Sequence, residues 1–174
     1  MINLFQFWDK LIPPDEVADL MATWEFETDF TYRRYDAESA GAYIAKHFDD
    51  VVLKAYRQCG VPAMQADFFR YCALYVEGGV YVDADTHRGN ALEPFLHQAD
   101  RGMLMTRGLG RGVRIANDFL FVRTSRDPLF AKVIDRAVRN INDRKVENVW
   151  RVTGPWIMTE MYNSNEASEL FDGF

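Results

Sequence analysis

The sequence predicts an α/β domain in which a mixed β-sheet is flanked by helices. Two observations support this class. Short segments rich in apolar and aromatic residues alternate with longer segments whose apolar residues recur at helical spacing. The chain has 174 residues, of which 48% are hydrophobic, so it can bury a substantial core. We therefore expect residues 1–174 to form one compact domain.

The expected elements follow from strand-like composition and from helix-start signals. The expected strands share a content of apolar, aromatic or threonine residues and cover 2–8, 26–35, 80–83, 102–106 and 118–123. The expected helices share a proline or aspartate near their start and cover 13–24, 36–47, 49–60, 63–77 and 127–142, with a last short one from 154.

Composition excludes some classes of function. The formal net charge is −6 and no dense block of Lys and Arg occurs, which argues against nucleic acid as the main partner. The first residues lack the basic flank of a signal peptide, and no apolar stretch is long enough to span a membrane, so we expect a cytoplasmic protein. Cys59 and Cys72 have no metal-site spacing and are expected to be buried free thiols.

The most informative segment is 70–85, which predicts a helix, a Gly78-Gly79 break and a short apolar strand. Asp83 and Asp85 follow at the exit of that strand. Alternate residues of a strand face the same way, so the two carboxylates are expected to share a face. Such a pair suits a hard divalent cation and, through it, a diphosphate, and open α/β sheets bind ligands at this edge.

Asp83 and Asp85 also fit other interpretations, each of which meets an objection. The pattern D-x-D-x-T also fits a phosphatase of the haloacid-dehalogenase type, with Asp83 as nucleophile and Asp85 as general acid. That class predicts the motif after the first strand and a later acidic pair, and the sequence has neither. Glycoside hydrolysis needs carboxylates on opposite sides of the scissile bond, which this spacing does not supply. The two aspartates could also belong to a plain surface turn. That interpretation leaves unexplained why so apolar a strand ends in two acids.

The helix before the strand adds two polar residues. Asp67 and Arg70 are three positions apart and therefore share a helical face. Taken alone, they could form a surface ion pair. Because the Gly-Gly break and the Asp-x-Asp pair follow at fixed spacing, we expect both side chains to face the same site.

The combined pattern D67-x-x-R70-x-x-x-L74-Y75-x-x-G78-G79-x-Y81-x-D83-x-D85 resembles the sugar-binding signature of the Asp-x-Asp glycosyltransferases. This family includes the yeast initiating α-1,6-mannosyltransferases, the capsular polysaccharide transferases and the large clostridial glucosylating toxins. Weaker similarities cover most of the remaining chain. They are the segment 5–8, Trp24 before the second strand, Asn117-Asp118 and 153–155.

The resemblance implies a GT-A-like (Rossmann-like) fold, a nucleotide-sugar donor and Mn²⁺ or Mg²⁺. It implies that Asp85 binds the metal directly, and that Asp83 holds the donor or binds the metal through water. Arg70 and Asp67 would hydrogen-bond donor hydroxyls, and Trp8 would stack on the base. Asp83, Asp85 and Arg70 are thus the expected catalytic residues.

Three further positions are candidates for the site. Asn117 is expected to contact the donor. Tyr81 either lines the site or packs in the core. His87 could be a further metal ligand or an exposed loop residue. The resemblance also implies a C-terminal His or Trp that closes on the diphosphate, and the printed sequence has neither beyond Trp156.

The implied reaction is transfer of a sugar, with retained anomeric configuration, from a nucleotide-sugar donor to a hydroxyl of a carbohydrate or lipid-linked acceptor. A UDP-sugar is favoured as donor, and a GDP-sugar is possible. A nucleotide-sugar-binding module without transfer remains open as an alternative.

The segment from Arg107 to Arg114 contains three glycines and three arginines in eight residues. We expect a mobile loop on the acceptor side of the cleft, because glycine frees the backbone. Arg111 or Arg114 would then bind the acceptor or the donor phosphate. A plain surface connection is the competing interpretation.

Overall fold

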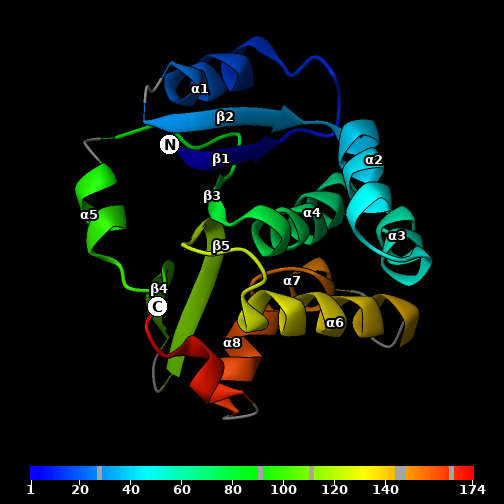
Figure 1. Ribbon diagram of the computed structural model, residues 1–174. Coiled ribbons are helices and arrows are strands. Elements are labelled where there is room, and N and C mark those ends of the chain that lie inside the picture. The colour runs from blue at the N-terminus through cyan, green and yellow to red at the C-terminus, as the bar shows by residue number, and fades with distance from the viewer. Residues whose placement is uncertain (27–28, 90–91, 110–111, 144–147, 165–166) are drawn as a thin grey trace.

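Five strands form one mixed sheet in the computed structural model, which describes residues 1–26, 29–89, 92–109, 112–143, 148–164 and 167–174. They are β1 (Ile2–Phe7), β2 (Phe30–Tyr35), β3 (Gly79–Val82), β4 (Gly102–Leu109) and β5 (Gly112–Val122). The spatial order is β2-β1-β3-β5-β4 (Figure 1). Strands β1, β2 and β3 run parallel, whereas β5 runs antiparallel to β3 and β4. The predicted mixed α/β class is confirmed.

Eight helices and a short 3₁₀ segment surround the sheet in the described residues. They are α1 (Asp15–Glu25), α2 (Ala37–His47), α3 (Asp50–Arg57), α4 (Pro62–Glu77), α5 (Glu93–Gln98), α6 (Pro128–Asp143), α7 (Val149–Val152), α8 (Trp156–Asn163) and η1 (Ser168–Phe171). Asp36 caps α2 by accepting from the Ser39 amide at 2.8 Å, and Asp49 caps α3. Both caps and the start of α4 at Pro62 agree with the sequence. Helix α5, α7 as a separate helix, and η1 were not predicted.

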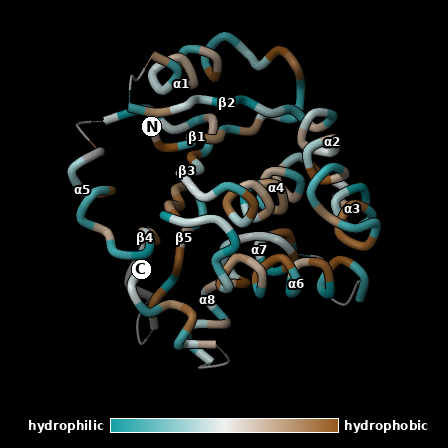
Figure 2. Tube along the Cα trace, in the orientation of Figure 1, coloured by the Kyte–Doolittle hydropathy of each residue, from teal (hydrophilic) through white to brown (hydrophobic). Residues whose placement is uncertain are grey.

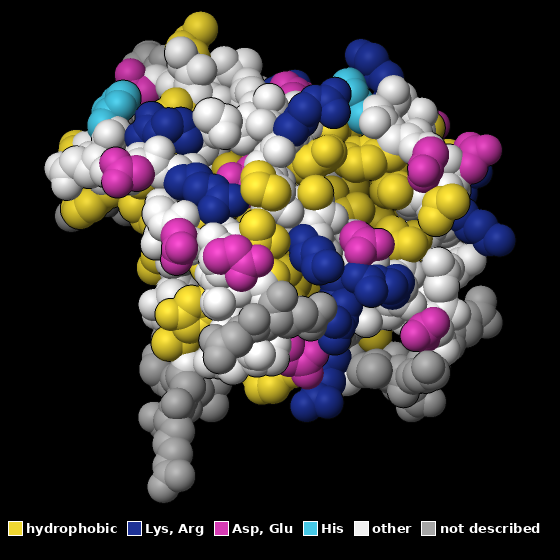
Figure 3. Space-filling view, turned by 60° about the horizontal axis from the view of Figure 1, so that its bottom comes forward, with side chains coloured by type: hydrophobic (Ala, Val, Ile, Leu, Met, Phe, Trp, Pro, Cys, Tyr) yellow, Lys and Arg dark blue, Asp and Glu magenta, His cyan; other side chains and the backbone are white. Residues whose placement is uncertain are grey.

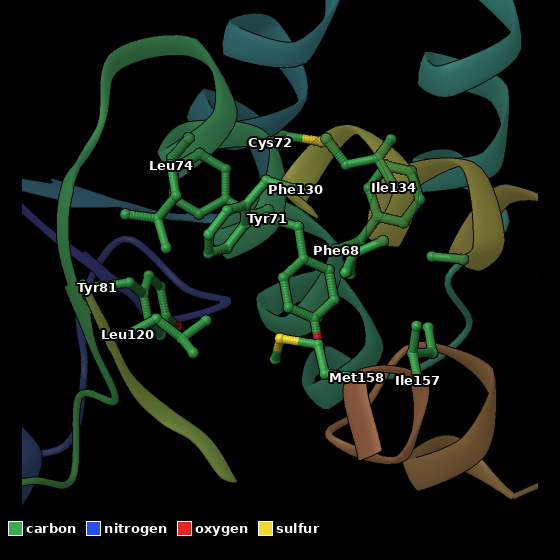
Figure 4. Packing of buried hydrophobic residues seen from close by; sticks show 14 of the residues in the cluster. Phe68, Tyr71, Cys72, Leu74, Tyr81, Leu120, Phe130, Ile134, Ile157 and Met158 are labelled. Atoms are coloured by element: carbon green, nitrogen blue, oxygen red, sulfur yellow. The ribbon is translucent and has the colours of Figure 1, made fainter. Parts of the chain in front are cut away.

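Both faces of the central strands are buried, each in its own apolar cluster. Neighbouring residues of a strand point to opposite faces and therefore belong to different clusters. Leu4 packs with Trp24 and Phe30 in the smaller apolar cluster, on the side covered by α1. Phe5 belongs to the larger cluster between the sheet and the helices α4, α6 and α8. Figure 4 shows Phe68, Tyr71 and Phe130 meeting in this larger cluster, and Figure 2 shows the hydrophobic residues along β5. Cys59 and Cys72 are buried free thiols, as predicted.

Gly78 and Gly79 allow α4 to pass directly into β3. Both have positive φ angles, +67° and +104°, which side chains rarely tolerate. A Cβ on Gly79 would also lie 2.4 Å from the carbonyl oxygen of Asn3 in β1. The two glycines therefore let β3 lie against β1, which fixes where the following aspartates emerge.

The predicted mobile loop at 107–114 is wrong for the residues that the structure describes. Strands β4 and β5 form a long hairpin, with Arg107 paired to Arg114 and Leu109 paired to Gly112. The backbone hydrogen bonds of the ladder extend into this glycine-containing segment and leave room for only a two-residue connection. That connection, Gly110 and Arg111, lies outside the described residues. The second strand also starts later than predicted, at Phe30.

The surface carries charges of both signs with hydrophobic side chains between them, as Figure 3 shows for one face. On α6, Arg139 lies 2.6 Å from Asp135, and Arg136 lies 3.8 Å from Glu160 of α8. Among the described residues, no helix is both long and apolar enough to cross a bilayer.

Candidate functional site

A cavity of about 560 Å³ opens beyond the ends of β1 and β3. Its walls come from the first turns of α4, from the residues after β1 and β3, and from β5 and α7. The polar and aromatic lining residues are Phe7, Trp8, Asp9, Asp67, Arg70, Asp83, Asp85, Arg114, Asn117, Asp118 and Trp150. The edge of the sheet that the sequence indicated is therefore hollowed.

The two aspartates of the Asp-x-Asp motif lie in a turn rather than along a strand. Strand β3 ends at Val82, and the amide of Thr86 donates to the Asp83 carbonyl at 3.1 Å. The alternation argument for a shared face therefore does not apply beyond Val82. Both carboxylates nevertheless line the same cavity, with Asp85 exposed and the Asp83 side chain 30% exposed.

Three hydrogen bonds fix this turn from the side of β1 and α1. The buried side chain of Gln6 donates to the Asp83 carbonyl at 3.3 Å. The indole of Trp24 donates to the Thr86 carbonyl at 2.8 Å, and Thr23 accepts from the Arg88 amide at 3.1 Å. Trp24 and the segment 5–8, which contains Gln6, resembled the family in the sequence, but the contact of Gln6 with the turn was not predicted.

Arg70 is the centre of the polar network beneath the cavity, with a side chain only 4% exposed. Its guanidinium lies 2.9 Å from Asp83 and 3.3 Å from Asp67. It also donates to the backbone carbonyls of Ala66 and Asn117. Asp67 and Arg70 thus face the Asp-x-Asp turn, as expected.

Both carboxylate oxygens of Asp67 are engaged. Asn117 donates to one at 2.8 Å and the hydroxyl of Thr153 donates to the other at 3.2 Å. Burial raises the pKa of Asp67, while Arg70 and the two hydrogen bonds act in the opposite direction. These contacts give Asn117 and Thr153 a physical role: they hold Asp67 in place. The role of Thr153 was not predicted.

The charges around Asp83 favour a bound cation. Burial raises the pKa of Asp83, Arg70 opposes this, and the negative charges of Asp67, Asp85 and Asp118 raise it further. A divalent cation would relieve this repulsion, and carboxylate oxygens are the ligands that Mg²⁺ and Mn²⁺ prefer. The described residues contain no ready group of three or more metal-ligating side chains, so a metal there would need oxygen atoms from a ligand or from water.

Trp8, Tyr81 and His87 lie in three different environments. Trp8 lines the cavity, and its buried indole N–H has no partner among the described residues. Tyr81 is fully buried, with the Arg70 guanidinium 4.4 Å from its ring centroid, so it packs in the core and does not line the cavity. His87 is exposed and lies outside the cavity lining, so the structure does not support it as a metal ligand.

The sequence model described as "Glycosyltransferase sugar-binding region containing DXD motif" matches residues 1–101, which is more than half of the chain. The chain belongs to this family. The matched region of this DXD family contains Asp67, Arg70, Asp83 and Asp85, but it excludes the cavity wall formed by β5 and α7.

Relatives within the DXD family are yeast proteins. The chain is 29% identical over 86 residues to the putative glycosyltransferase HOC1 of Saccharomyces cerevisiae, which covers 48% of this chain and 22% of that protein. It is 33% identical over 91 residues to the initiation-specific alpha-1,6-mannosyltransferase of Candida albicans. This match covers 48% of this chain and 24% of that protein. The matches thus span about a quarter of the length of these relatives.

Solved structures show the same fold. The PaToxG glycosyltransferase superposes with a TM-score of 0.72 at 20% identity, covering 98% of this chain and 72% of that one. The UDP-bound glycosyltransferase domain of the YGT toxin superposes with a TM-score of 0.50 at 12% identity. This match covers 79% of this chain and 50% of that one. The expected GT-A-like fold is therefore confirmed.

Among the described residues of the arginine-rich segment, Arg114 lines the cavity, and it does so from a strand. Arg114 lies on β5, and its guanidinium is 4.8 Å from the ring centroid of Trp150 on α7. Arg111, the other arginine expected to bind phosphate, lies outside the described residues. Trp150 was not predicted as a site residue; an aromatic residue close to the Gly-Pro landmark was the only signal.

Proposed function

We propose that this chain is a metal-dependent glycosyltransferase that moves a sugar from a nucleotide-sugar donor to a hydroxyl of a carbohydrate or lipid-linked acceptor. One observation carries the proposal: the Asp-x-Asp turn, the buried Asp67–Arg70 pair and Trp8 all line one cavity of about 560 Å³. Pockets of that size hold nucleotide-sized ligands. The DXD family and the names of the yeast relatives support the class of reaction.

Each lining residue has a role in this proposal. Asp85, exposed in the cavity, binds Mn²⁺ or Mg²⁺ directly, and Asp83 holds the donor or the metal through water. Asp67 and Arg70 hydrogen-bond donor hydroxyls, and Trp8 stacks on the base. A UDP-sugar is the favoured donor because the YGT domain is described as UDP-bound, with a GDP-sugar as the second choice.

The chemistry is cleavage of the anomeric C–O bond, which leaves a nucleoside diphosphate. The bound cation would neutralise the negative charge that develops on this leaving group. Asp83 is paired with Arg70, and both oxygens of Asp67 accept hydrogen bonds. Neither carboxylate is therefore placed as a free nucleophile, which argues against a double displacement through Asp83 or Asp67. In the retaining reaction that we propose, the acceptor oxygen would attack the anomeric carbon on the face that the diphosphate leaves, and the hydroxyl proton would pass to the departing diphosphate.

Asp85→Ala tests the metal role. We expect the variant to lose Mn²⁺-dependent binding of UDP and GDP in calorimetric titrations, because the exposed carboxylate is the direct ligand. Its melting temperature should remain that of the wild type. Asp135→Ala, which removes an exposed acid on α6, is the matched control. If Asp85→Ala binds nucleotide with unchanged dependence on Mn²⁺, the metal site lies elsewhere.

A binding module without transfer is the second candidate, because the family description names a sugar-binding region and matches only residues 1–101. Release of UDP from a UDP-sugar, stimulated by an acceptor, distinguishes a transferase from a module. The phosphatase alternative loses support, because the proposed nucleophile Asp83 is 2.9 Å from Arg70 and the chain belongs to the DXD family.

A further inference from the structure

Arg114 and Trp150 form one wall of the cavity, and the family match gives this wall no function. Arg114 lies on β5 and Trp150 at the start of α7, and both line the cavity. Both residues lie outside the matched region 1–101. Trp150 is 53% exposed although it is a large aromatic residue. An exposed aromatic beside a charged residue in a cavity is a typical binding surface.

Arg114 differs from Arg70, the other arginine of the cavity, in how its charge is used. Arg70 is paired with Asp67 and Asp83 and donates to two backbone carbonyls. Among the described residues, Arg114 contacts the Trp150 ring but forms no ion pair, and its buried Nε has no hydrogen-bond partner. Its positive charge is therefore available to an anionic ligand.

The wall lies on the opposite side of the Asp-x-Asp turn from Trp8. Trp8 follows β1 and Asp83 follows β3, and β5 is the next strand across the sheet. The carbonyl of Asp118 accepts from the Asp83 amide at 2.9 Å. Because β5 runs antiparallel to β3, Arg114, which precedes Asp118 on β5, lies beyond the end of β3. If the base lies at Trp8 and the diphosphate at the aspartates, Arg114 lies beyond both.

Helix α7 connects this wall to the donor side. Asn148 caps the helix by accepting from the Trp150 amide at 2.9 Å. At the other end of the helix, Thr153 donates to Asp67. Trp150 is thus carried by a short helix that is capped at its start and attached to Asp67 at its end, which favours a preformed surface over an adaptable one.

We propose that Arg114 and Trp150 form the acceptor subsite and that the acceptor is an anionic sugar. Its ring packs on the exposed part of the indole, and its carboxylate or phosphate pairs with Arg114. This inference rests on the proposed function, because it assigns the donor to the Trp8 side of the same cavity.

The test compares sugars that differ only in charge. Methyl β-D-glucuronide is compared with methyl β-D-glucoside, and glucose 6-phosphate with glucose, in titrations of the full chain with UDP and Mn²⁺ present. We expect the charged member of at least one pair to bind about tenfold more tightly, as a charge-assisted pair provides. The carboxylate and phosphate pairs identify which anion fits.

Two variants at the wall and one control complete the test. Arg114→Gln should abolish the preference for the charged sugar and leave UDP affinity unchanged. Trp150→Ala should weaken the charged and neutral sugars alike. Arg139→Gln, on the exposed face of α6, should keep the preference.

Three results would overturn the inference: no preference in the wild type, a preference that survives in Arg114→Gln, or a fall in UDP affinity in that variant, which would assign Arg114 to the donor diphosphate. Failure of the proposed function is separate, because the wild type would then not bind UDP or GDP with Mn²⁺ at all.

Discussion

Helix α4 contributes to two arginine–carboxylate clusters that differ in structure. At its middle, Arg70 meets Asp67 and Asp83. At its C-terminal end, Glu77 accepts two hydrogen bonds from Arg33 of β2, at 3.0 and 2.5 Å, and one from Tyr43 of α2 at 2.8 Å. The Glu77 cluster has one negative charge for one positive charge.

The difference between the clusters lies in charge balance, burial and access to the cavity. The Arg70 cluster is more deeply buried, carries an excess of negative charge and lines the cavity. Burial raises the pKa of both Asp67 and Asp83. Burial alone would also raise the pKa of Glu77, but hydrogen bonds from Arg33 and Tyr43 hold it below its usual range. A balanced cluster serves the fold, whereas an unbalanced one beside a cavity indicates a ligand.

The largest expected effect is that of Arg70→Ala. Removing this cation leaves two largely buried carboxylates without their partner, so the free energy of unfolding should fall by about 3–5 kcal/mol. Urea denaturation measures this. Arg33→Ala is the comparison, and it should cost about 1 kcal/mol or less because its ion pair is partly exposed. Equal losses in the two variants would contradict the distinction between the clusters.

Thr153→Val should have an intermediate effect. It removes the hydroxyl that donates to Asp67 at 3.2 Å and leaves a buried carboxylate oxygen unsatisfied, which costs about 1–3 kcal/mol. We also expect weaker nucleotide-sugar binding, because Asp67, which is proposed to contact the donor, is then no longer held by Thr153. Thr153→Ser keeps the hydroxyl and should restore both unfolding free energy and binding. If Thr153→Val has the unfolding free energy and the nucleotide-sugar affinity of the wild type, the hydrogen bond to Asp67 has no such role.

The sequence was sufficient to predict the parts of the site that are adjacent in the chain. The Gly78-Gly79 break and the spacing of Asp67, Arg70, Asp83 and Asp85 predicted a helix–strand unit with polar residues at its exit, because these residues act through local geometry. All four line the cavity.

The remaining part of the site depends on long-range contacts. Gln6, Thr153 and Trp150 reach the site through pairings that local patterns do not encode. Gln6 and Asp83 are 77 positions apart in the chain, and Thr153 and Asp67 are 86 positions apart. Strands at 102–106 and 118–123 were predicted, but their extension to Leu109 and back to Gly112 was missed for a similar reason. Glycine propensity favours a loop at 108–112, but cross-strand hydrogen bonding overrides it.

The smallest expected effect is a dependence of stability on pH that Glu77→Gln should remove. The pKa of Glu77 is lower in the folded protein than in the unfolded chain. Its contribution to stability is therefore complete above the ordinary glutamate pKa of about 4.3 and is lost as the pH falls through the lowered value. The difference in unfolding free energy between wild type and Glu77→Gln should be below about 1 kcal/mol at pH 7 and should shrink in acid.

Ionisation of Asp83 should change stability in the opposite direction to ionisation of Glu77. Asp83→Asn therefore tests the comparison of the two clusters. The raised pKa of Asp83 means that its ionisation disfavours the folded state, so stability is lost as the pH rises from the ordinary aspartate pKa of about 3.9 through the raised value. As the pH rises, the wild type should therefore become less stable relative to Asp83→Asn but more stable relative to Glu77→Gln. Urea denaturation between about pH 3 and 7 measures both curves. Parallel curves for the two variants would mean that the clusters do not differ in charge balance, and the argument that an excess of negative charge beside the cavity attracts a cation would then lose its basis.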